Sequence, residues 1–375
     1  MPGRRGPSTL AGPTASKTPS LVPASVRDRA APGDLLEREL ANWSARNSTS
    51  AERYDLERLL ELKRQTVSVV LPAREVGRTI PSVLDALAPL RRAGLIEELV
   101  VVDAASADGT AGIAGERGAA VLQESEILPG FGAARGKGDA MWRGLAATSG
   151  EIVVYIDTDT HDFDERFLLG MLGPLLERPE LQFVKGTFRR PFEIGGIAVP
   201  DGGGRVTELV ARPLLNLFRP ELGGFGQPLA GETAARRALL EELPYPVGYG
   251  VEIGMLIDVA ARAGLDAMAE VNLGTRRHRH QSLRELSTMA LAVLGTASRR
   301  IHDADSVAEI GGAAAIALPA DGGRELREVS LEERPPLATV SADERRTARK
   351  VLSTALESGL GAAMPLEGVA ALGSR

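Results

Sequence analysis

Four short apolar runs, each followed by a stretch with helical spacing, constrain the fold of this chain more than any other feature. The runs are rich in Val, Ile and Leu and cover residues 66–71, 96–102, 119–122 and 152–156. Between the first two, apolar residues recur at helical spacing, as at Ile80, Val83 and Leu87. Such alternation predicts an α/β fold with a mostly parallel sheet that is flanked by helices on both faces.

The same alternation predicts where a ligand binds. In open parallel sheets, ligands bind beyond the carboxyl ends of the strands. Pro72, Asp103 and Asp157 each directly follow one of the apolar runs. We therefore expect these three residues to lie at one edge of the sheet and to mark the functional site.

Composition excludes several classes of function. The chain has 375 residues, a net charge of -6 and no cysteine. The lack of cysteine excludes disulfides, thiolate chemistry and a Cys-ligated zinc, and it fits a cytoplasmic location. The negative charge argues against nucleic-acid binding by the whole surface. No apolar run reaches the roughly 18 residues of a membrane span, so we expect neither nucleic acid nor a membrane as partner.

The tripeptide Asp157-Thr158-Asp159 carries the strongest chemical signal. Its two carboxylates lie two residues apart at the end of a buried strand. Hard oxygen ligands suit Mg²⁺ or Mn²⁺, which would bridge a diphosphate. The alternative is a pair of solvated loop carboxylates that cap the next helix.

A second acidic loop, residues 103–110, falls at the same predicted edge. Asp103 can accept hydrogen bonds from a base or a ribose, whereas Asp108 is explained more simply as a cap for the helix that begins near Thr110. Glu252 opens a later apolar helix. Its carboxylate is either a partner of the helix dipole or a group that binds sugar hydroxyls.

Two glycine loops with a basic residue predict anion sites. In the first, Lys137 lies between Gly136 and Gly138 at a helix start, which suits a diphosphate, although the spacing is not that of a P-loop. In the second, residues 202–207, Arg205 and Thr207 follow three glycines and suit a phosphorylated acceptor. A flexible glycine loop is the alternative for the second.

The segment 276–280 holds two of the four histidines, His278 and His280, between arginines. A neutral histidine could complete the metal shell that the Asp pair begins. A solvated basic strand is the alternative.

Taken in order, these segments resemble the glucosyl-3-phosphoglycerate synthase family, which includes mannosyl-3-phosphoglycerate synthases. The densest match contains GGGRVTELVARPLLNLFRPEL, QPLAGE and GYGVEIGMLIDV; the matching stretches are 67–73, 98–110, 136–159, 184–191 and 202–281. The resemblance implies a glycosyltransferase A-type fold and a homodimer. It also implies metal-dependent, retaining transfer of a hexose from a nucleoside-diphosphate sugar to the 2-hydroxyl of 3-phospho-D-glycerate.

The resemblance also implies a role for each matching residue. The metal ligands would be Asp159 and His278. The catalytic residues would be Asp159, Glu252 and Leu229, the last through its backbone carbonyl near the reacting carbon in a front-face attack. The nucleotide sugar would be bound by Pro72, Ala73, Glu75, Asp103, Ala104, Lys137, Asp157, Thr158, Asp159 and Glu232. The acceptor would be bound by Gly204, Arg205, Thr207, Arg276 and His280.

The chain departs from the family pattern near the predicted base site. After Pro72-Ala73 the family usually has Asn-Glu, where this chain has Arg74 and Glu75, and its usual Ser after the strand-ending Asp is Ala104 here. These positions touch the uridine in members that use UDP-glucose. We therefore expect a shifted donor choice that favours GDP-mannose or GDP-glucose.

Pattern and resemblance together divide the chain. We expect a disordered tail over residues 1–33, N-terminal helices over 34–65, a nucleotide-sugar-binding half over 66–182, an acceptor-binding and catalytic half over 183–295, and a partly helical or disordered extension over 296–375. Asp34, Ser50 and Ser341 are the expected caps of helices in the outer segments.

Two other functions stay open at this point. A haloacid dehalogenase-type phosphatase would use Asp157 as nucleophile and Asp159 as acid, but its motif normally comes early and is followed by a second acidic pair. A non-catalytic sensor of nucleotide sugars would bind the same ligands without turnover.

Overall fold

The computed structural model describes residues 32–194, 197–199, 203–276, 282–301, 313–320 and 323–360. Most of the expected tail, His278 and His280 therefore lie outside the described residues.

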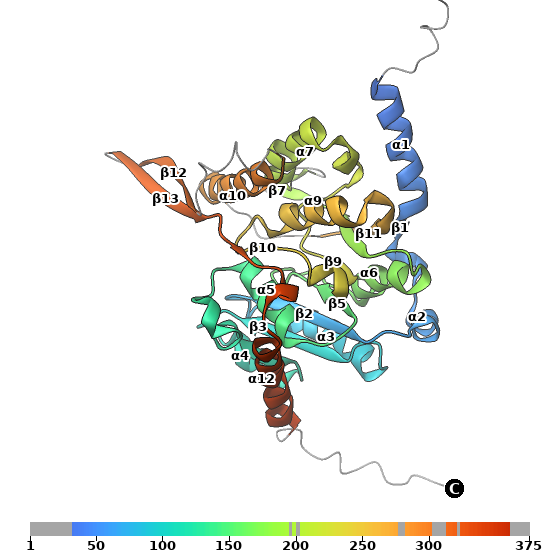
Figure 1. Ribbon diagram of the computed structural model, residues 1–375, viewed down its shortest axis with the longest axis vertical. Coiled ribbons are helices and arrows are strands. Elements are labelled where there is room, and N and C mark those ends of the chain that lie inside the picture. The colour runs from blue at the N-terminus through green and yellow to red at the C-terminus, as the bar shows by residue number, and fades with distance from the viewer. Residues whose placement is uncertain are drawn as a thin grey trace, which may run out of the picture.

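The predicted α/β fold is confirmed within the described part (Figure 1). An eight-stranded sheet has the spatial order β1 (Ser48–Ser50), β11 (Met268–Thr275), β6 (Phe183–Arg189), β9 (Thr233–Arg236), β5 (Ile152–Tyr155), β2 (Val67–Ala73), β3 (Glu98–Asp103) and β4 (Ala120–Gln123).

Strand direction brings the predicted site residues to one edge of this sheet. β9 runs antiparallel to both of its neighbours, β5 and β6, while the other neighbouring strands are parallel. Ala73 is in register with Asp103, and Asp103 with Gln123. The carboxyl ends of the parallel strands therefore share an edge with the amino end of β9.

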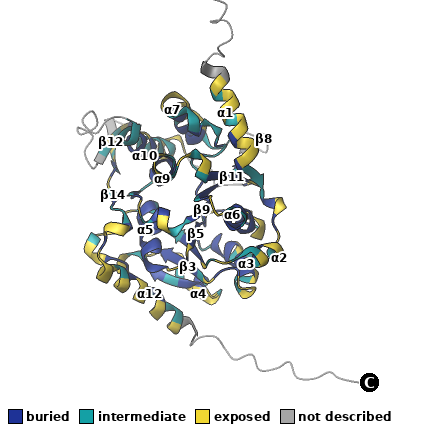
Figure 2. Cartoon of the chain, turned by 45° about the vertical axis from the view of Figure 1, so that its right-hand side comes forward, coloured by how far each residue is buried: buried dark blue, intermediate teal, exposed yellow. Residues whose placement is uncertain are grey.

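Two apolar layers bury the faces of the sheet. Alternate side chains of β2 enter different layers, with Val69 and Leu71 on one face and Val70 on the other, as the period of two in a strand requires. The first layer is covered by α3 (Ile80–Arg92), α4 (Thr110–Glu116) and α6 (Glu165–Glu177), and the second by α5 (Lys137–Ala147), α9 (Val251–Ala263) and α12 (Ala342–Leu360). Figure 2 shows the strands buried between these helices.

The N-terminal segment differs from the sequence prediction. After α1 (Pro32–Asn47), residues 48–50 form the edge strand β1, which no apolar alternation had indicated. The N-terminal helix that was expected to begin after its cap Ser50 is interrupted. Ser50 caps only a 3₁₀ turn, Ala51–Arg53, and Asp55 accepts a hydrogen bond from the Arg58 N–H at 2.8 Å to start α2 (Leu56–Leu62). The second cap makes the break because it satisfies the free N–H groups of a new helix.

The remaining elements follow β6 along the chain. They are β7 (Phe192–Ile194), β8 (Ile197–Val199), a π-helical turn Thr207–Ala211, α7 (Arg212–Phe218), α8 (Arg237–Leu240), β10 (Tyr245–Pro246), α10 (Leu283–Ile301), β12 (Ala313–Ala320), β13 (Gly323–Ser330) and β14 (Glu333–Arg334). The expected cap of α12 is confirmed, since Ser341 Oγ accepts from the Glu344 N–H at 3.2 Å. Among the described residues, no helix has both the length and the apolar character to cross a bilayer.

Candidate functional site

Lys137 forms ion pairs with carboxylates from two different elements of the site. It is the first residue of α5, and its ammonium group forms ion pairs with Asp157, after β5, and with Glu252, in the first turn of α9, at 2.6 Å to Glu252 Oε1. Burial lowers the pKa of Lys137, but the two carboxylates outweigh this effect and hold the pKa above its usual value. Lys137 therefore carries a fixed positive charge at the carboxyl edge of the sheet.

Close packing of α5 on β10 explains this position of Lys137. A Cβ added to Gly138 would overlap with the Pro246 carbonyl oxygen, and the Asp139 N–H donates to the Val247 carbonyl at 3.1 Å. Gly138 therefore serves the contact between helix and strand, while diphosphate binding by this loop stays a prediction. Because α9 begins shortly after Val247, this packing brings Lys137 beside Glu252.

The start of α5 is also held by a buried charge cluster. The Asp139 carboxylate accepts hydrogen bonds from Arg143, at 3.0 Å, and from Arg334 of β14, at 2.8 and 2.5 Å. Asp139 and Arg143 are fully buried. Removing one partner from such a cluster leaves an uncompensated buried charge, so the geometry around Lys137 is strongly constrained.

Asp159 is the site's solvent-facing carboxylate. Its partial burial and the negative charge of Asp157 raise the pKa of the Asp159 carboxyl. A cation bound to these oxygens would relieve that repulsion. Within the described ranges no group of three His, Asp or Glu side chains is placed to hold a metal. The carboxylate oxygens of Asp157 and Asp159 suit a hard cation, but metal binding stays a prediction, since His278, the other predicted ligand, lies outside those ranges.

Thr158 fixes the separation of the two carboxylates. Its side chain is buried and its hydroxyl donates to the Pro72 carbonyl at 2.7 Å, while the Thr79 hydroxyl donates to the Thr158 carbonyl at 2.6 Å. The hydroxyl of Thr158 thus ties the acidic loop to β2. Nucleotide binding by Thr158 stays a prediction.

The predicted base and ribose site lies at the ends of β2 and β3. Asp103 is 1% exposed; its Oδ2 accepts hydrogen bonds from Ser106 N and Gln123 Nε2, whereas Oδ1 has no hydrogen-bond partner among the described residues. Glu75 accepts from the Ala107 N–H at 2.8 Å, so its carboxylate holds the neighbouring loop. Asp108 accepts from the Thr110 N–H at 3.1 Å and so supports the start of α4, although Gly109, not Asp108, occupies the cap position.

On the acceptor side, Gly204 has φ +68°, a left-handed conformation that favours glycine, and it leads into the helical turn that holds Arg205 and Thr207. Arg276 is fully buried, forms an ion pair with Glu232 and contacts the ring of Phe188 at 5.2 Å. Burial lowers the pKa of Arg276 to about 10. Arg276 thus orients Glu232, and its direct contact with an acceptor stays a prediction.

Comparisons with known proteins agree with this geometry. Residues 68–209 match the profile of glycosyl transferase family 2. The chain is 45% identical over 279 residues to glucosyl-3-phosphoglycerate synthase of Mycolicibacterium smegmatis, covering 74% of this chain and 90% of the relative. The chain belongs to the glucosyl-3-phosphoglycerate synthase family. The phosphatase alternative is thereby set aside.

Two solved structures extend the match in three dimensions. Mannosyl-3-phosphoglycerate synthase from Rubrobacter xylanophilus has a TM-score of 0.72 and 45% identity, covering 80% of this chain and 99% of that one. Glucosyl-3-phosphoglycerate synthase from Mycobacterium tuberculosis, in complex with Mn²⁺, UDP-glucose and phosphoglyceric acid, has a TM-score of 0.69 and 44% identity, covering 78% and 98%. The fold is thus of the glycosyltransferase A type, as the resemblance implied.

The sequence analysis did not identify Arg190, which lies near the candidate site. Arg190 follows β6, its carbonyl accepts from the Gly203 N–H at 3.0 Å, and its guanidinium lies 4.9 Å from the Phe188 ring centre. Burial lowers the pKa of Arg190, against the opposing charges of Asp157 and Asp159. In the sequence, the only indication of this role is that Arg190 directly follows a buried strand and lies near the glycine loop 202–207.

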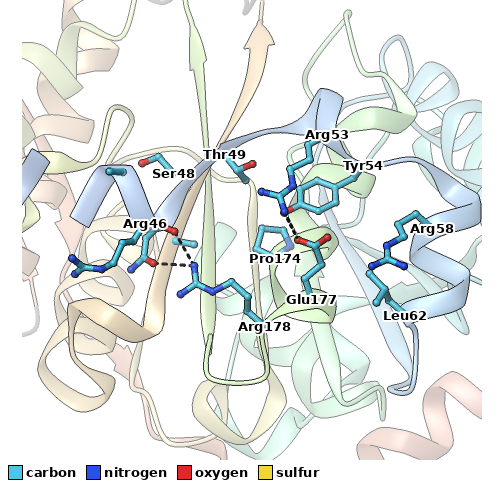
Figure 3. A pocket seen from close by; sticks show the side chains of 13 residues that line it. Arg46, Ser48, Thr49, Arg53, Tyr54, Arg58, Leu62, Pro174, Glu177 and Arg178 are labelled. Carbon is cyan, nitrogen blue, oxygen red and sulfur yellow. Dashed lines mark hydrogen bonds and ion pairs between the residues drawn. The ribbon is translucent and has the colours of Figure 1, made fainter. Parts of the chain in front are cut away.

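A cavity elsewhere in the molecule does not belong to this site. It measures about 400 Å³ and lies where β1 and β11 begin, at the opposite edge of the sheet (Figure 3). Four arginines line it, Arg46, Arg53, Arg58 and Arg178, and each forms an ion pair with a carboxylate. Their charge is therefore already balanced within the protein.

Glu270 gives this family member a measurable pH dependence of stability. Burial raises the pKa of its carboxyl from 4.5 to about 7. Because its pKa is higher in the folded state than in the unfolded chain, Glu270 stabilises the fold fully at pH values below its unfolded pKa. This contribution is lost as the pH rises through about 7. Between pH 4.5 and 8, we expect the unfolding free energy of the wild type to fall by about 3 kcal/mol relative to that of Glu270→Gln. Urea unfolding at both pH values checks this; a constant difference would contradict it.

Proposed function

We propose that the chain transfers a hexose from a nucleoside-diphosphate sugar to the 2-hydroxyl of 3-phospho-D-glycerate, with retention of anomeric configuration. The observation that carries the proposal is the ion-paired cluster of Lys137, Asp157 and Glu252, where the carboxyl end of β5 meets the starts of α5 and α9. The ligands of the M. tuberculosis relative, UDP-glucose and phosphoglyceric acid, support it.

The donor half of the site suits a departing diphosphate. As the bond between the sugar C1 and the diphosphate oxygen breaks, its electron pair stays on that oxygen, and Lys137 stabilises the new charge. Asp159 and His278 would hold Mg²⁺ or Mn²⁺, which would supply Lewis-acid stabilisation of the diphosphate. Manganese in the related structure supports a divalent cation.

The acceptor half suits an acid that carries a phosphate. Gly204, Arg205 and Thr207 would bind the anionic groups and place the 2-hydroxyl oxygen on the same face of C1 that the diphosphate leaves. The new bond joins that oxygen to C1, and the hydroxyl proton passes to the departing phosphate oxygen. Glu252 and Glu232 would orient the sugar, and the Leu229 carbonyl would face C1 as positive charge develops there.

The residues near the predicted base site bear on which nucleotide sugar is the preferred donor. Arg74 and Ala104 replace the residues with which UDP-glucose users contact uridine, and Glu75 is committed to the 104–107 loop. The structural relative from R. xylanophilus is a mannosyl-3-phosphoglycerate synthase. These observations support GDP-mannose or GDP-glucose as preferred donor.

A donor panel tests the reaction and the donor together. With 3-phosphoglycerate and Mg²⁺ or Mn²⁺, we expect GDP-mannose or GDP-glucose to give a hexosyl-phosphoglycerate at least about tenfold faster than UDP-glucose, which corresponds to about 1.4 kcal/mol. Product mass and anomer analysis measure the outcome, and chelation of the metal should abolish it. Turnover of UDP-glucose alone would refute the donor shift, and donor binding without turnover would instead indicate a sensor.

The homodimer and the cytoplasmic location also stay predictions. The hairpin of β12 and β13 projects from the body of the molecule (Figure 1). Leu326 on this hairpin and Leu283 at the start of α10 are 71% and 69% exposed. Exposed apolar side chains on a projecting arm support contact with a second copy of the chain.

A further inference from the structure

The backbone segment that holds Leu229 lies within the site. The Ala230 N–H donates to the Gln227 carbonyl at 3.0 Å and closes a turn over residues 227–230. Gly231 follows, and its backbone lies so near Asp157 that an added Cβ would overlap with both carboxylate oxygens. The orientation of the turn therefore decides which backbone carbonyls face the donor.

A buried lysine and a buried glutamate hold the two ends of this turn. Lys185 Nζ donates to the Ala230 carbonyl at 2.7 Å, and Glu270 Oε1 accepts from the Gly226 N–H at 2.6 Å. Lys185 on β6 and Glu270 on β11 are in register on neighbouring parallel strands. Two charged side chains on adjacent strands thus hold the turn: Glu270 binds the residue before it, and Lys185 binds its last residue.

The local backbone is shaped to receive these contacts. A Cβ on Gly226 would lie 2.5 Å from Thr187 Oγ1, so a larger residue here would displace that hydroxyl or shift the backbone whose N–H reaches Glu270. The Gly186 N–H on β6 donates to the Glu232 carbonyl at 2.9 Å, just beyond the turn. The segment from 226 to 232 is therefore pinned at three points.

The two charges are expensive to bury, which argues for a specific role. Lys185 is 1% exposed and Glu270 is 8% exposed. Burial lowers the pKa of Lys185 to about 8 and raises that of Glu270 to about 7. Apolar residues of similar volume are often at least as stabilising as a buried charged pair. Stability alone therefore does not explain this pair.

We propose that Lys185 and Glu270 are positioning residues. Together they fix the turn 227–230 and the preceding Gly226 so that the Leu229 carbonyl faces the reacting carbon. The inference rests on the proposed function for the role of the Leu229 carbonyl. Neither side chain touches the substrates; both act through the backbone. Because a misplacement of about 1 Å can cost about 100-fold in rate, loss of either anchor should lower kcat and leave donor binding nearly unchanged.

Four single variants and one double variant test the proposal. Lys185→Met removes the donor at similar length, Glu270→Leu removes the acceptor, and Glu270→Gln keeps an acceptor oxygen without the charge. Val184→Ala, at a fully buried position next to Lys185 on β6, is the matched control for lost stability. Each is measured for kcat, for the KM of the donor that the wild type prefers, and for thermal unfolding.

We expect Lys185→Met and Glu270→Leu to lower kcat about 100-fold with the donor KM within about threefold of the wild type. Glu270→Gln should stay within about fivefold, and Val184→Ala should unfold at lower temperature with nearly unchanged kcat. The double variant Lys185→Met, Glu270→Leu should lose little more than either single one, because both anchors act on one turn. Wild-type kcat in Lys185→Met, or a loss that appears only in KM or stability, would overturn the proposal.

Amide hydrogen exchange separates this inference from the proposed function. In Lys185→Met, or in Glu270→Leu should the first variant not fold, the Leu229 and Ala230 amides should exchange at least about tenfold faster, while amides of β6 stay protected. This result is independent of turnover. Unchanged exchange at the turn would refute the anchoring, whereas a wild type that transfers no hexose would refute the proposed function alone.

Discussion

Replacing Asp159 by Asn should lower kcat/KM for hexose transfer at least about 1000-fold, which is about 4 kcal/mol of transition-state stabilisation. Asp159 is the solvent-facing carboxylate of the acidic pair, and its pKa is raised by burial and by Asp157. The amide of Asn is a weaker ligand for a hard cation, and it does not neutralise the charge of that cation. The same variant should lose binding of Mn²⁺ in a calorimetric titration.

A nearby carboxylate provides the control for Asp159→Asn. Glu165, in the first turn of α6, is exposed and lies six residues further along the chain. Glu165→Gln changes the net charge by the same amount and should keep kcat/KM within about twofold. Equal losses in both variants would mean that net charge, not metal binding, sets the rate. Full activity of Asp159→Asn would remove the proposed metal role.

A single added methyl group at Gly231 should lower kcat/KM about 100-fold or more. In Gly231→Ala the new Cβ would overlap with both Asp157 carboxylate oxygens. Asp157 would have to move away from Lys137, which breaks the ion pair at the centre of the proposed donor site. Steady-state kinetics with the preferred donor measure the loss, and it should appear in both donor KM and kcat.

Gly248→Ala is the matched control for Gly231→Ala. Gly248 lies in the loop before α9, and an added Cβ would meet nothing within 4 Å. This variant should keep nearly full activity and stability. Normal activity of Gly231→Ala would show that Asp157 can move without harm and would contradict the assigned role of the Lys137–Asp157 pair.

The sequence predicted well which residues share the carboxyl edge of the sheet, for a clear physical reason. Buried parallel strands read as continuous apolar runs, and the residues that end these runs include Asp103 and Asp157. The ends of the runs lie within about two residues of the observed strand ends, as for β2 and β5. The parallel topology that the alternation predicts then places both aspartates at one edge without further information.

Other features had no local signal in the sequence. Ser48–Ser50 is polar and three residues long, and only its pairing with β11 makes it a strand. The Lys185–Glu270 pair joins residues that are 85 positions apart, and periodicity predicts which side chains are buried but not which ones pair. The packing role of Gly138 had no such signal either, because a glycine's neighbour in space, here Pro246, cannot be read from its neighbours in sequence.

The ion pair between Arg334 and Asp139 changes how the C-terminal extension should be regarded. Arg334 also donates to the Ala133 carbonyl at 2.9 Å, and β14 is paired with β10, on which α5 rests. The extension thus reaches back some 195 positions to brace the helix whose first residue is Lys137. A shortened or grafted version of this chain must therefore keep Arg334, because without it Asp139 at the start of α5 would lose one of its two buried arginine partners.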